Sequence, residues 1–229
     1  IVGCGLIGKK RALNLDKSKA KILFCNDINS VASQNFAKQF KCKSIKNYKD
    51  INLKDIDAVF VSTTHDKLAE ICSFFINKKK HVFVEKPAAI NFKEISKLAI
   101  LKRKHKNIEV GVGLNHRFHP AFIKAFEIFQ SGKIGKLMFI RAQYGHGGRL
   151  GYDKEWRADV KISGGGELID QGAHLIDLSQ LFLGDLKLLS GNTRTYFWNM
   201  KVDDNCFITL ENKNKSIAFL QASCTEWKN

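Results

Sequence analysis

The sequence has few prolines, few acidic residues and no long apolar run. Only two prolines occur in 229 residues, and 22 acidic residues face 38 Lys and Arg, a formal net charge of +16. No apolar run approaches the roughly 20 residues of a membrane span. No charged segment followed by an apolar stretch opens the chain as an export signal would. We therefore expect a cytoplasmic protein with no membrane partner.

The six cysteines lack the spacing of a metal or redox site. No Cys-x-x-Cys pair occurs, and no histidine stands at zinc spacing from a cysteine. Most lie among apolar neighbours, as Cys25 does after Phe24 and Cys72 does after Ile71. We expect buried thiols in a reducing compartment and no metal site.

The basic residues are spread along the whole chain. Only 78–80 and 102–104 form short basic clusters, and both fall where a helix is expected to end, a position that favours cations. No basic stripe or recognition motif for nucleic acid accompanies them. The abundance of Lys, Asn, Ile and Phe is typical of an AT-rich genome. We expect no nucleic-acid partner, although a positive field would help gather an anionic ligand such as a dinucleotide.

The first half of the chain alternates short apolar runs with longer amphipathic stretches. The pattern predicts strands at 1–2, 21–26, 56–62, 81–85 and 109–114, and helices at 9–15, 31–40, 68–77 and 92–104. Strands that alternate with helices are typical of an α/β fold, in which a parallel sheet is covered on both faces. A nucleotide-binding strand normally has about five or six residues, whereas two precede Gly3, so we expect a fragment of a longer protein.

The pattern changes after residue 116. It predicts helices at 120–130 and 167–183, and strands at 136–144, 186–199, 206–211 and 216–224. Consecutive strands joined by short turns indicate a mostly antiparallel second sheet in an α+β domain. We expect two domains, at 1–116 and 117–229.

A glycine motif opens the chain. Gly3, Gly5 and Gly8, with Leu6 and Ile7 between them, form a Gly-x-Gly-x-x-Gly run after an apolar strand and before a helix. In a dinucleotide-binding turn the first glycine permits the tight turn, the second admits the pyrophosphate and the third allows close packing. The N–H groups of the helix start would hold the phosphates. The alternative is a plain glycine-rich turn.

Other polar residues stand where strands of such a sheet end. Asp27 lies close to the roughly 20-residue offset at which an acid binds the adenosine ribose, so it favours NAD over NADP. A surface Asp in a turn is the alternative. Thr63, Thr64 and His65 follow a later strand and are expected to contact the cofactor, although His65 could equally be a neighbour of a helix cap.

Two further motifs carry a family resemblance. Glu85-Lys86-Pro87 follows an expected strand, and Asp170 stands four residues before His174. With the glycine turn, in this order, they resemble the Gfo/Idh/MocA oxidoreductases. That resemblance implies an N-terminal Rossmann domain and an open-faced, largely antiparallel sheet. It also implies a longer full-length protein that forms homo-oligomers.

The resemblance assigns roles to these residues. Lys86 would contact the reacting substrate oxygen and the nicotinamide, Glu85 would have an orienting role, and a cis peptide before Pro87 would aim Lys86. On a helix, Asp170 and His174 share one face. His174 can exchange a proton near neutral pH, and Asp170 could orient it or bind a second hydroxyl. A helix-stabilising Asp–His pair is the alternative.

Two segments are expected to bind ligands as well. Asn115 and Arg117 resemble the family's Asn-x-Arg segment at the domain junction, so we expect them to contact the cofactor, with the substrate as the alternative partner of Arg117. The loop before the second-domain helix carries candidate substrate-binding residues, which are Arg149, Tyr152, Trp156 and Arg157. Aromatic rings suit a sugar face, and guanidiniums suit anionic groups. This segment resembles members tied to bacterial polysaccharide biosynthesis, which indicates a nucleotide-sugar.

Together these features predict an NAD(P)-dependent dehydrogenase acting on CH–OH groups. It would transfer a hydride between a nicotinamide cofactor, NAD rather than NADP, and a secondary alcohol or ketone of a sugar, nucleotide-sugar or polyol. The alternative is a non-catalytic dinucleotide sensor of the same fold. Retention of Lys86 together with Asp170 and His174 argues against that alternative.

Overall fold

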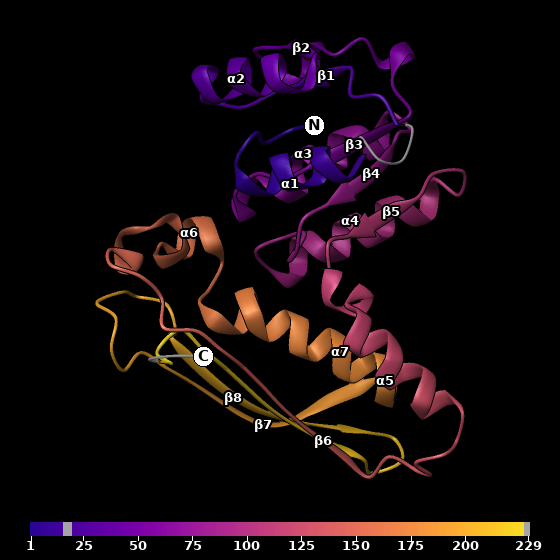
Figure 1. The fold of residues 1–229 in the computed structure, drawn as a ribbon, viewed down its shortest axis with the longest axis vertical. Helices are drawn as coiled ribbons and strands as arrows, with labels where there is room; N and C mark the ends of the chain where they lie inside the picture. Colours follow the sequence, from indigo (N-terminus) through magenta and orange to yellow (C-terminus); the bar gives the residue numbers. More distant parts are fainter. Residues whose placement is uncertain (16–19, 227–229) are drawn as a thin grey trace. The chain divides into compact units, whose positions relative to one another are not determined.

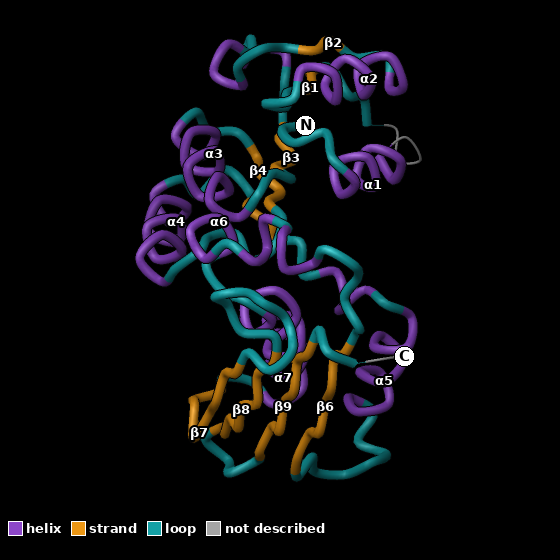
Figure 2. Tube along the Cα trace, turned by 90° about the vertical axis from the view of Figure 1, so that its left-hand side faces the viewer, coloured by secondary structure: helices purple, strands orange, loops and turns teal. Residues whose placement is uncertain are grey.

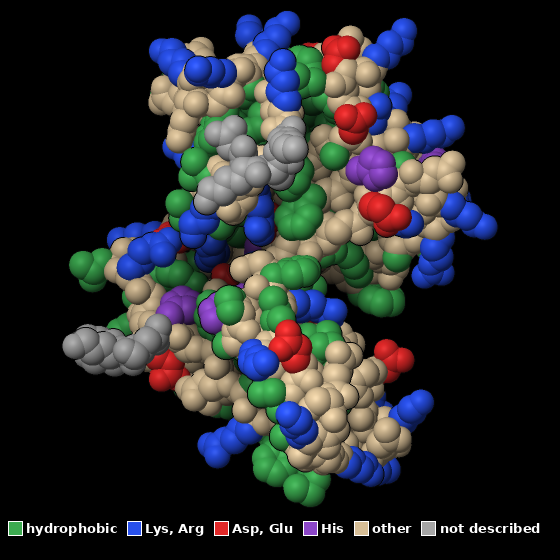
Figure 3. Space-filling model, turned by 45° about the vertical axis from the view of Figure 1, so that its right-hand side comes forward, with side chains coloured by type: hydrophobic (Ala, Val, Ile, Leu, Met, Phe, Trp, Pro, Cys, Tyr) green, Lys and Arg blue, Asp and Glu red, His purple; other side chains and the backbone are tan. Residues whose placement is uncertain are grey.

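The structure is a computed structural model that describes residues 1–15 and 20–226. It divides into two compact units, Ile1–Gly113 and Leu114–Asn229. Among the described residues no helix is long and apolar enough to cross a membrane. Lys and Arg side chains are scattered over the face drawn in Figure 3 and do not gather into a stripe.

The first unit is built on parallel strands (Figure 2). The strands are β1 (Phe24–Cys25), β2 (Lys43–Ser44), β3 (Ala58–Val61), β4 (His81–Val84) and β5 (Val110–Val112). β1 pairs with β2, and β3, β4 and β5 form a second ladder in that order, all in parallel. Val2 joins the two ladders through parallel bridges to Asn26 and Val61. On either side of Val2 the strands follow one another in opposite directions across the sheet. Such sheets bind their ligands at this point.

Helices follow the strands of this unit (Figure 1). They are α1 (Leu6–Leu15), α2 (Ser30–Phe40), α3 (His65–Asn77) and α4 (Phe92–Lys104), with 3-10 turns at Tyr48–Asp50 and Leu53–Asp55. Asn29 and Asn91 cap α2 and α4 by accepting backbone N–H groups of the first turn. The basic clusters 78–80 and 102–104 lie at the carboxyl ends of α3 and α4, as predicted.

The core of the first unit lies between β3–β4 and the helices that follow them. Val61 and Val84 are fully buried against Leu68 and Phe75 of α3. Each buried aliphatic or aromatic side chain contributes about 1.5–3 kcal/mol. This packing fixes the strands whose ends carry the proposed cofactor-binding residues.

The second unit has a mixed four-stranded sheet with one helix across it (Figures 1 and 2). Its elements are α5 (Pro120–Gln130), β6 (Phe139–Gly145), α6 (Val160–Ser163), α7 (Ala173–Leu183), β7 (Leu186–Arg194), β8 (Asn205–Asn212) and β9 (Ile217–Ser223). The strand order is β6-β9-β8-β7, with β6 parallel to β9 and the other pairs antiparallel. The prediction of a mostly antiparallel sheet is confirmed.

One face of this sheet packs and the other is open. Leu175 and Leu183 of α7 pack against Ile208 and Leu220 of the sheet. On the opposite face, Phe219 of the central strand β9 is 47% exposed. The open face predicted by the family resemblance is therefore present in the described residues.

The helix expected at 167–183 differs in its first turns. Leu168–Gly172 is π-helical, and the α-helix begins only at Ala173. Close packing accompanies the wide turn, because a Cβ on Gly172 would lie 3.2 Å from Leu168 Cδ1. π-turns within helices occur frequently at functional sites. Asp170 lies inside this π-turn.

All six cysteines are free thiols, and five of them are buried, as expected. Burial alone raises the pKa of Cys72 to about 12, so this thiol carries no thiolate at neutral pH.

Candidate active site

The opening glycine turn has the geometry of a phosphate-binding turn. Gly3 has a φ of +95°, and a Cβ there would lie 2.4 Å from the Ser62 carbonyl oxygen. A Cβ on Gly8 would lie 2.0 Å from the Gly3 carbonyl oxygen, so α1 packs tightly on the turn. At Gly5 no described atom lies within 4 Å of the Cβ position. The turn thus leaves open the place where a pyrophosphate would approach the backbone, and the residues fit NAD.

Leu6 and Ile7 form the first residues of α1 and are both exposed. The first helical bond of this segment runs from Lys9 N–H to the Gly5 carbonyl. The N–H groups of the preceding residues therefore have no partner within the helix and are available to phosphate oxygens.

Asp27 is fastened to the glycine turn by its carboxylate. Oδ2 accepts the Cys4 N–H at 2.7 Å, and Oδ1 accepts the Asn29 N–H at 2.8 Å. Each carboxylate oxygen keeps a second acceptor site for a ribose hydroxyl. The backbone of the turn and the carboxylate therefore form one rigid arrangement.

The residues after β3 lead directly into α3. Thr64 precedes the helix, and its hydroxyl donates to Asp66 at 2.7 Å. Thr63 is partly buried beside it, and His65 is the first residue of α3 and is buried.

Glu85 lies at the end of β4 and is paired within the first unit. Its Oε1 accepts from Arg11 Nε at 2.5 Å, and the guanidinium of Arg11 also stacks over Phe83 at 5.1 Å. A Cβ on Gly113 would lie 2.8 Å from Glu85 Oε2, so the backbone just after β5 lies close to the carboxylate. The Lys86–Pro87 peptide is cis, as the resemblance implied. Arg11 was missed because its partner is 74 residues away.

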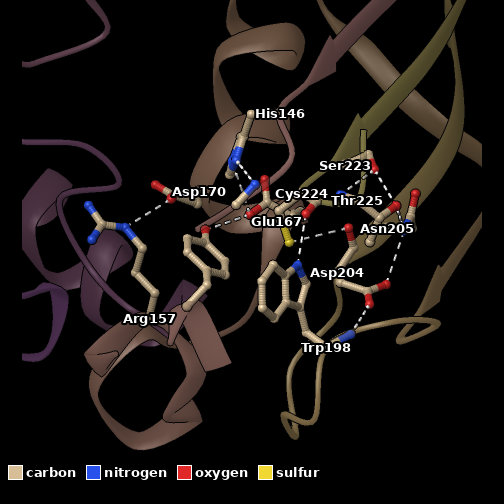
Figure 4. Close-up of polar contacts among 12 residues, drawn as sticks. His146, Arg157, Glu167, Asp170, Trp198, Asp204, Asn205, Ser223, Cys224 and Thr225 are labelled. Carbon is tan, nitrogen blue, oxygen red and sulfur yellow. Dashed lines mark hydrogen bonds and ion pairs between the residues drawn. The ribbon is translucent and has the colours of Figure 1, made fainter. Parts of the chain in front are cut away.

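In the second unit the expected acid–histidine pair is buried. Asp170 and His174 are only 6% and 5% exposed. Arg157 Nε lies 3.3 Å from Asp170 Oδ2, an ion pair seen in Figure 4. The structure thus brings together Arg157 and Asp170, which the sequence placed in separate segments.

Glu167 is a second buried carboxylate near this pair (Figure 4). It is 2% exposed, accepts from the Tyr152 hydroxyl at 3.0 Å, and lies 3.7 Å from His146 Nε2. Burial and then the charges of Glu167 and Asp170 raise the pKa of Tyr152, so its hydroxyl stays a donor. Because its side chain is buried, Tyr152 supports the loop from the interior of the second unit. Glu167 was missed, although an acid in a glycine-rich apolar run was a signal.

The other loop residues lie nearer the surface. Arg149 pairs with Glu155 at 2.6 Å and stacks over the Tyr152 ring at 5.8 Å. Arg157 stacks over the Trp156 ring at 4.5 Å. Ion pairs and stacking contacts therefore link the predicted aromatic and basic residues along one loop.

Two aspartates outside the predicted set each accept hydrogen bonds from backbone N–H groups. Asp203 accepts from the backbone N–H groups of Gly166 and Leu168, at 3.0 and 2.8 Å. Asp204 is fully buried and accepts the N–H groups of Tyr196, Phe197 and Trp198. Backbone hydrogen bonds hold the pKa of Asp204 below its ordinary value despite its burial, which acts in the opposite direction. Asp203 lies 35 residues from Leu168 in sequence, which hid its role.

Arg117 lies in the 3-10 turn Asn115–Phe118 and clamps α7. Its Nε and Nη2 reach the two oxygens of Asp177 at 2.6 and 2.5 Å. The hydrogen bonds to Asp177 raise the pKa of Arg117, so the guanidinium keeps its charge. Asn115 is exposed at the start of this turn.

Arg117→Ala is expected to lower the free energy of unfolding by about 1–3 kcal/mol, because it leaves the Asp177 carboxylate buried without its cation. Chemical denaturation of the intact protein measures this. Arg117→Ala combined with Asp177→Leu is expected to recover part of the loss, because the orphaned charge is then gone. A variant that lost NAD affinity with unchanged stability would instead make Arg117 a cofactor ligand.

A histidine that the sequence analysis did not select lies against His174. The rings of His116 and His174 are stacked with centroids 3.9 Å apart and planes 12° apart. Tyr144 of β6 lies near both rings, 5.4 Å from His116 and 6.5 Å from His174.

The first unit combines a parallel sheet, a glycine turn that is open at Gly5 and an acid at the end of the next strand. These features define a dinucleotide-binding domain. Comparison with known proteins agrees with this. Residues 1–114 match the family "Oxidoreductase family, NAD-binding Rossmann fold", and residues 122–229 match the "GFO/IDH/MocA C-terminal domain". The chain belongs to the GFO/IDH/MocA family of oxidoreductases, which confirms the resemblance.

Several similar proteins are named as oxidoreductases, and some of them are named for a sugar. An uncharacterised oxidoreductase, YrbE of Bacillus subtilis, is 30% identical over 80% of this chain and 53% of its own length. The dTDP-3,4-didehydro-2,6-dideoxy-alpha-D-glucose 3-reductase of Saccharopolyspora spinosa is 26% identical over 84% and 58%. Levoglucosan dehydrogenase, solved with NADH and L-sorbose, shares the fold with a TM-score of 0.92 at 21% identity over 99% and 66%. The chain thus spans little more than half of these curated relatives.

Proposed function

We propose that the intact protein is an NAD-dependent dehydrogenase of a secondary alcohol on a sugar, nucleotide-sugar or polyol. The observation that carries the proposal is the buried Asp170–His174 pair, held in one helical segment of a chain whose other unit has an open dinucleotide turn. The bound cofactor supplies the hydride chemistry, and the protein supplies placement and charge.

His174 takes the hydroxyl proton of the substrate as general base. Lys86 stabilises the charge that develops on the same oxygen, as an ammonium does for an alkoxide. The carbon loses its hydrogen as a hydride and becomes a ketone, so one proton and one hydride leave the alcohol. In the reverse direction His174 returns the proton to the oxygen.

Asp170 forms an ion pair with Arg157, so its charge is balanced without a contribution from the substrate. Its pairing with Arg157 at 3.3 Å supports an orienting role beside His174. Glu85 has the corresponding role beside Lys86, because Arg11 fixes its carboxylate. Both acids therefore orient a neighbouring catalytic group.

The loop of the second unit supports this substrate class. Trp156 offers a ring to a sugar face, and Arg149 and Arg157 offer guanidiniums to a diphosphate. The dTDP-sugar reductase supports a nucleotide-sugar, and levoglucosan dehydrogenase supports a free sugar. Asp27 supports NAD over NADP, because its carboxylate would repel a 2′-phosphate.

The test is a panel of sugars, polyols and nucleotide-sugars offered to the intact protein with NAD and with NADP. Absorbance of the reduced nicotinamide reports turnover, and quenching of intrinsic fluorescence reports cofactor binding. We expect turnover with NAD for at least one carbohydrate class. Tight NAD binding without turnover of any member, in either direction, would replace the enzyme with a dinucleotide sensor.

A further inference from the structure

The stacked pair of histidines is held in place from two sides. His116 lies in the 3-10 turn that the Arg117–Asp177 ion pair fixes to α7, the helix that carries His174. The turn is closed by the hydrogen bond from His119 N–H to the His116 carbonyl at 3.0 Å. The backbone that carries the His116 ring is therefore fixed beside α7.

Tyr144 completes the group from the sheet. Its ring plane is within 12° of that of His116 and within 19° of that of His174. Burial and then the charges of Asp170 and Glu167 raise the pKa of Tyr144. The phenol is therefore uncharged near neutral pH, and it restricts the plane of both imidazoles without adding a charge.

We propose that His116 is a positioning residue for His174, one that sets the plane of the His174 imidazole and couples its protonation to its own. The inference rests on the proposed function, in which His174 is the proton-accepting group. Flat rings 3.9 Å apart at 12° leave the His174 ring one orientation of its plane. Two positive charges at this separation repel, so the pair takes up its two protons in two separate steps.

The charged and titratable groups on the elements packed around the pair are Asp170, Glu167 and Asp177 as acids, Arg157 and Arg117 as bases, and His146 and Tyr144. Arg157 is engaged with Asp170 and Arg117 with Asp177. The titratable ring that stacks on His174 is that of His116.

The test compares His116→Phe, which keeps a flat ring without a charge, with His116→Ala, which removes the ring. Intact protein labelled with carbon-13 at histidine Cε1 is titrated by NMR, with His174→Ala identifying the His174 signal. We expect the His174 signal to titrate in two steps in the wild type and in a single step in His116→Phe. His119→Phe is the matched control, because His119 is exposed, lies three residues after His116 and packs edge-on against Phe122.

Kinetics provide the second measurement. We expect His116→Phe to keep kcat within about threefold of the wild type and His116→Ala to lose about tenfold in kcat with an unchanged KM for NAD. Identical His174 titrations in the wild type and His116→Phe would overturn the coupling, and equal kcat in His116→Ala would overturn the positioning. If instead His174→Ala is active, the assignment of His174 as the proton acceptor in the proposed function fails whatever the titration shows, so the two failures are separate.

Discussion

His174→Ala is expected to lower kcat by about 10²- to 10⁴-fold, because a positioned general base contributes about that factor. NAD affinity is expected to stay within about twofold of the wild type, since His174 is not part of the dinucleotide turn. Steady-state rates with the substrate found in the panel measure the first quantity, and fluorescence titration with NAD measures the second.

Two further variants sharpen this result. Lys86→Ala is expected to lose a comparable factor in kcat, because the charge on the reacting oxygen loses its ammonium. His119→Ala, an exposed histidine of the same unit, serves as the control and is expected to keep full activity. A fully active His174→Ala enzyme would remove His174 from the chemistry.

Gly3→Ala and Gly5→Ala are expected to fail in different ways although they are two residues apart. Gly3 has a φ of +95° and its Cβ would lie 2.4 Å from a carbonyl oxygen, so Gly3→Ala is strained and crowded. We expect it to lower the free energy of unfolding by at least about 2 kcal/mol. At Gly5 no described atom lies within 4 Å of the Cβ position, so Gly5→Ala is expected to fold with nearly normal stability.

The added methyl of Gly5→Ala would occupy the place where the pyrophosphate approaches the backbone. NAD affinity is therefore expected to fall by about tenfold or more, about 1.4 kcal/mol. Thermal unfolding without cofactor and fluorescence titration with NAD separate the two effects. Gly5→Ala with wild-type NAD affinity would mean that the phosphates do not contact this turn.

The local features of the active-site segments were predictable because they depend on near neighbours in the chain. The glycine turn, the helix ends at the basic clusters and the strands of the parallel sheet follow from backbone freedom, capping and apolar periodicity over a few residues. Both the helices Phe92–Lys104 and Pro120–Gln130 were predicted to the residue. Their boundaries carry strong local signals, an Asn cap in the first and Pro120 at the start of the second.

The π-turn at Leu168–Gly172 was not predictable in this way. The sequence from Glu167 onwards has an ordinary helical pattern, and a regular α-helix was expected there. The wide turn depends on Gly166 meeting Asp203 and on Gly172 packing near Cys206, contacts with a distant strand and loop. The pattern of apolar residues within the helix does not depend on those contacts, so it could not predict the π-turn.

By itself the sequence determined the class of protein, because the glycine turn, Lys86 and the Asp170–His174 spacing are each contained in one short segment. Only the tertiary structure decided what holds these groups. Arg11 reaches Glu85 across 74 residues and Arg117 reaches Asp177 across 60. It also placed His116 on His174, 3.9 Å away. Such partners meet because the packed core brings distant backbone together, and pairing across that distance leaves no periodic trace in the chain.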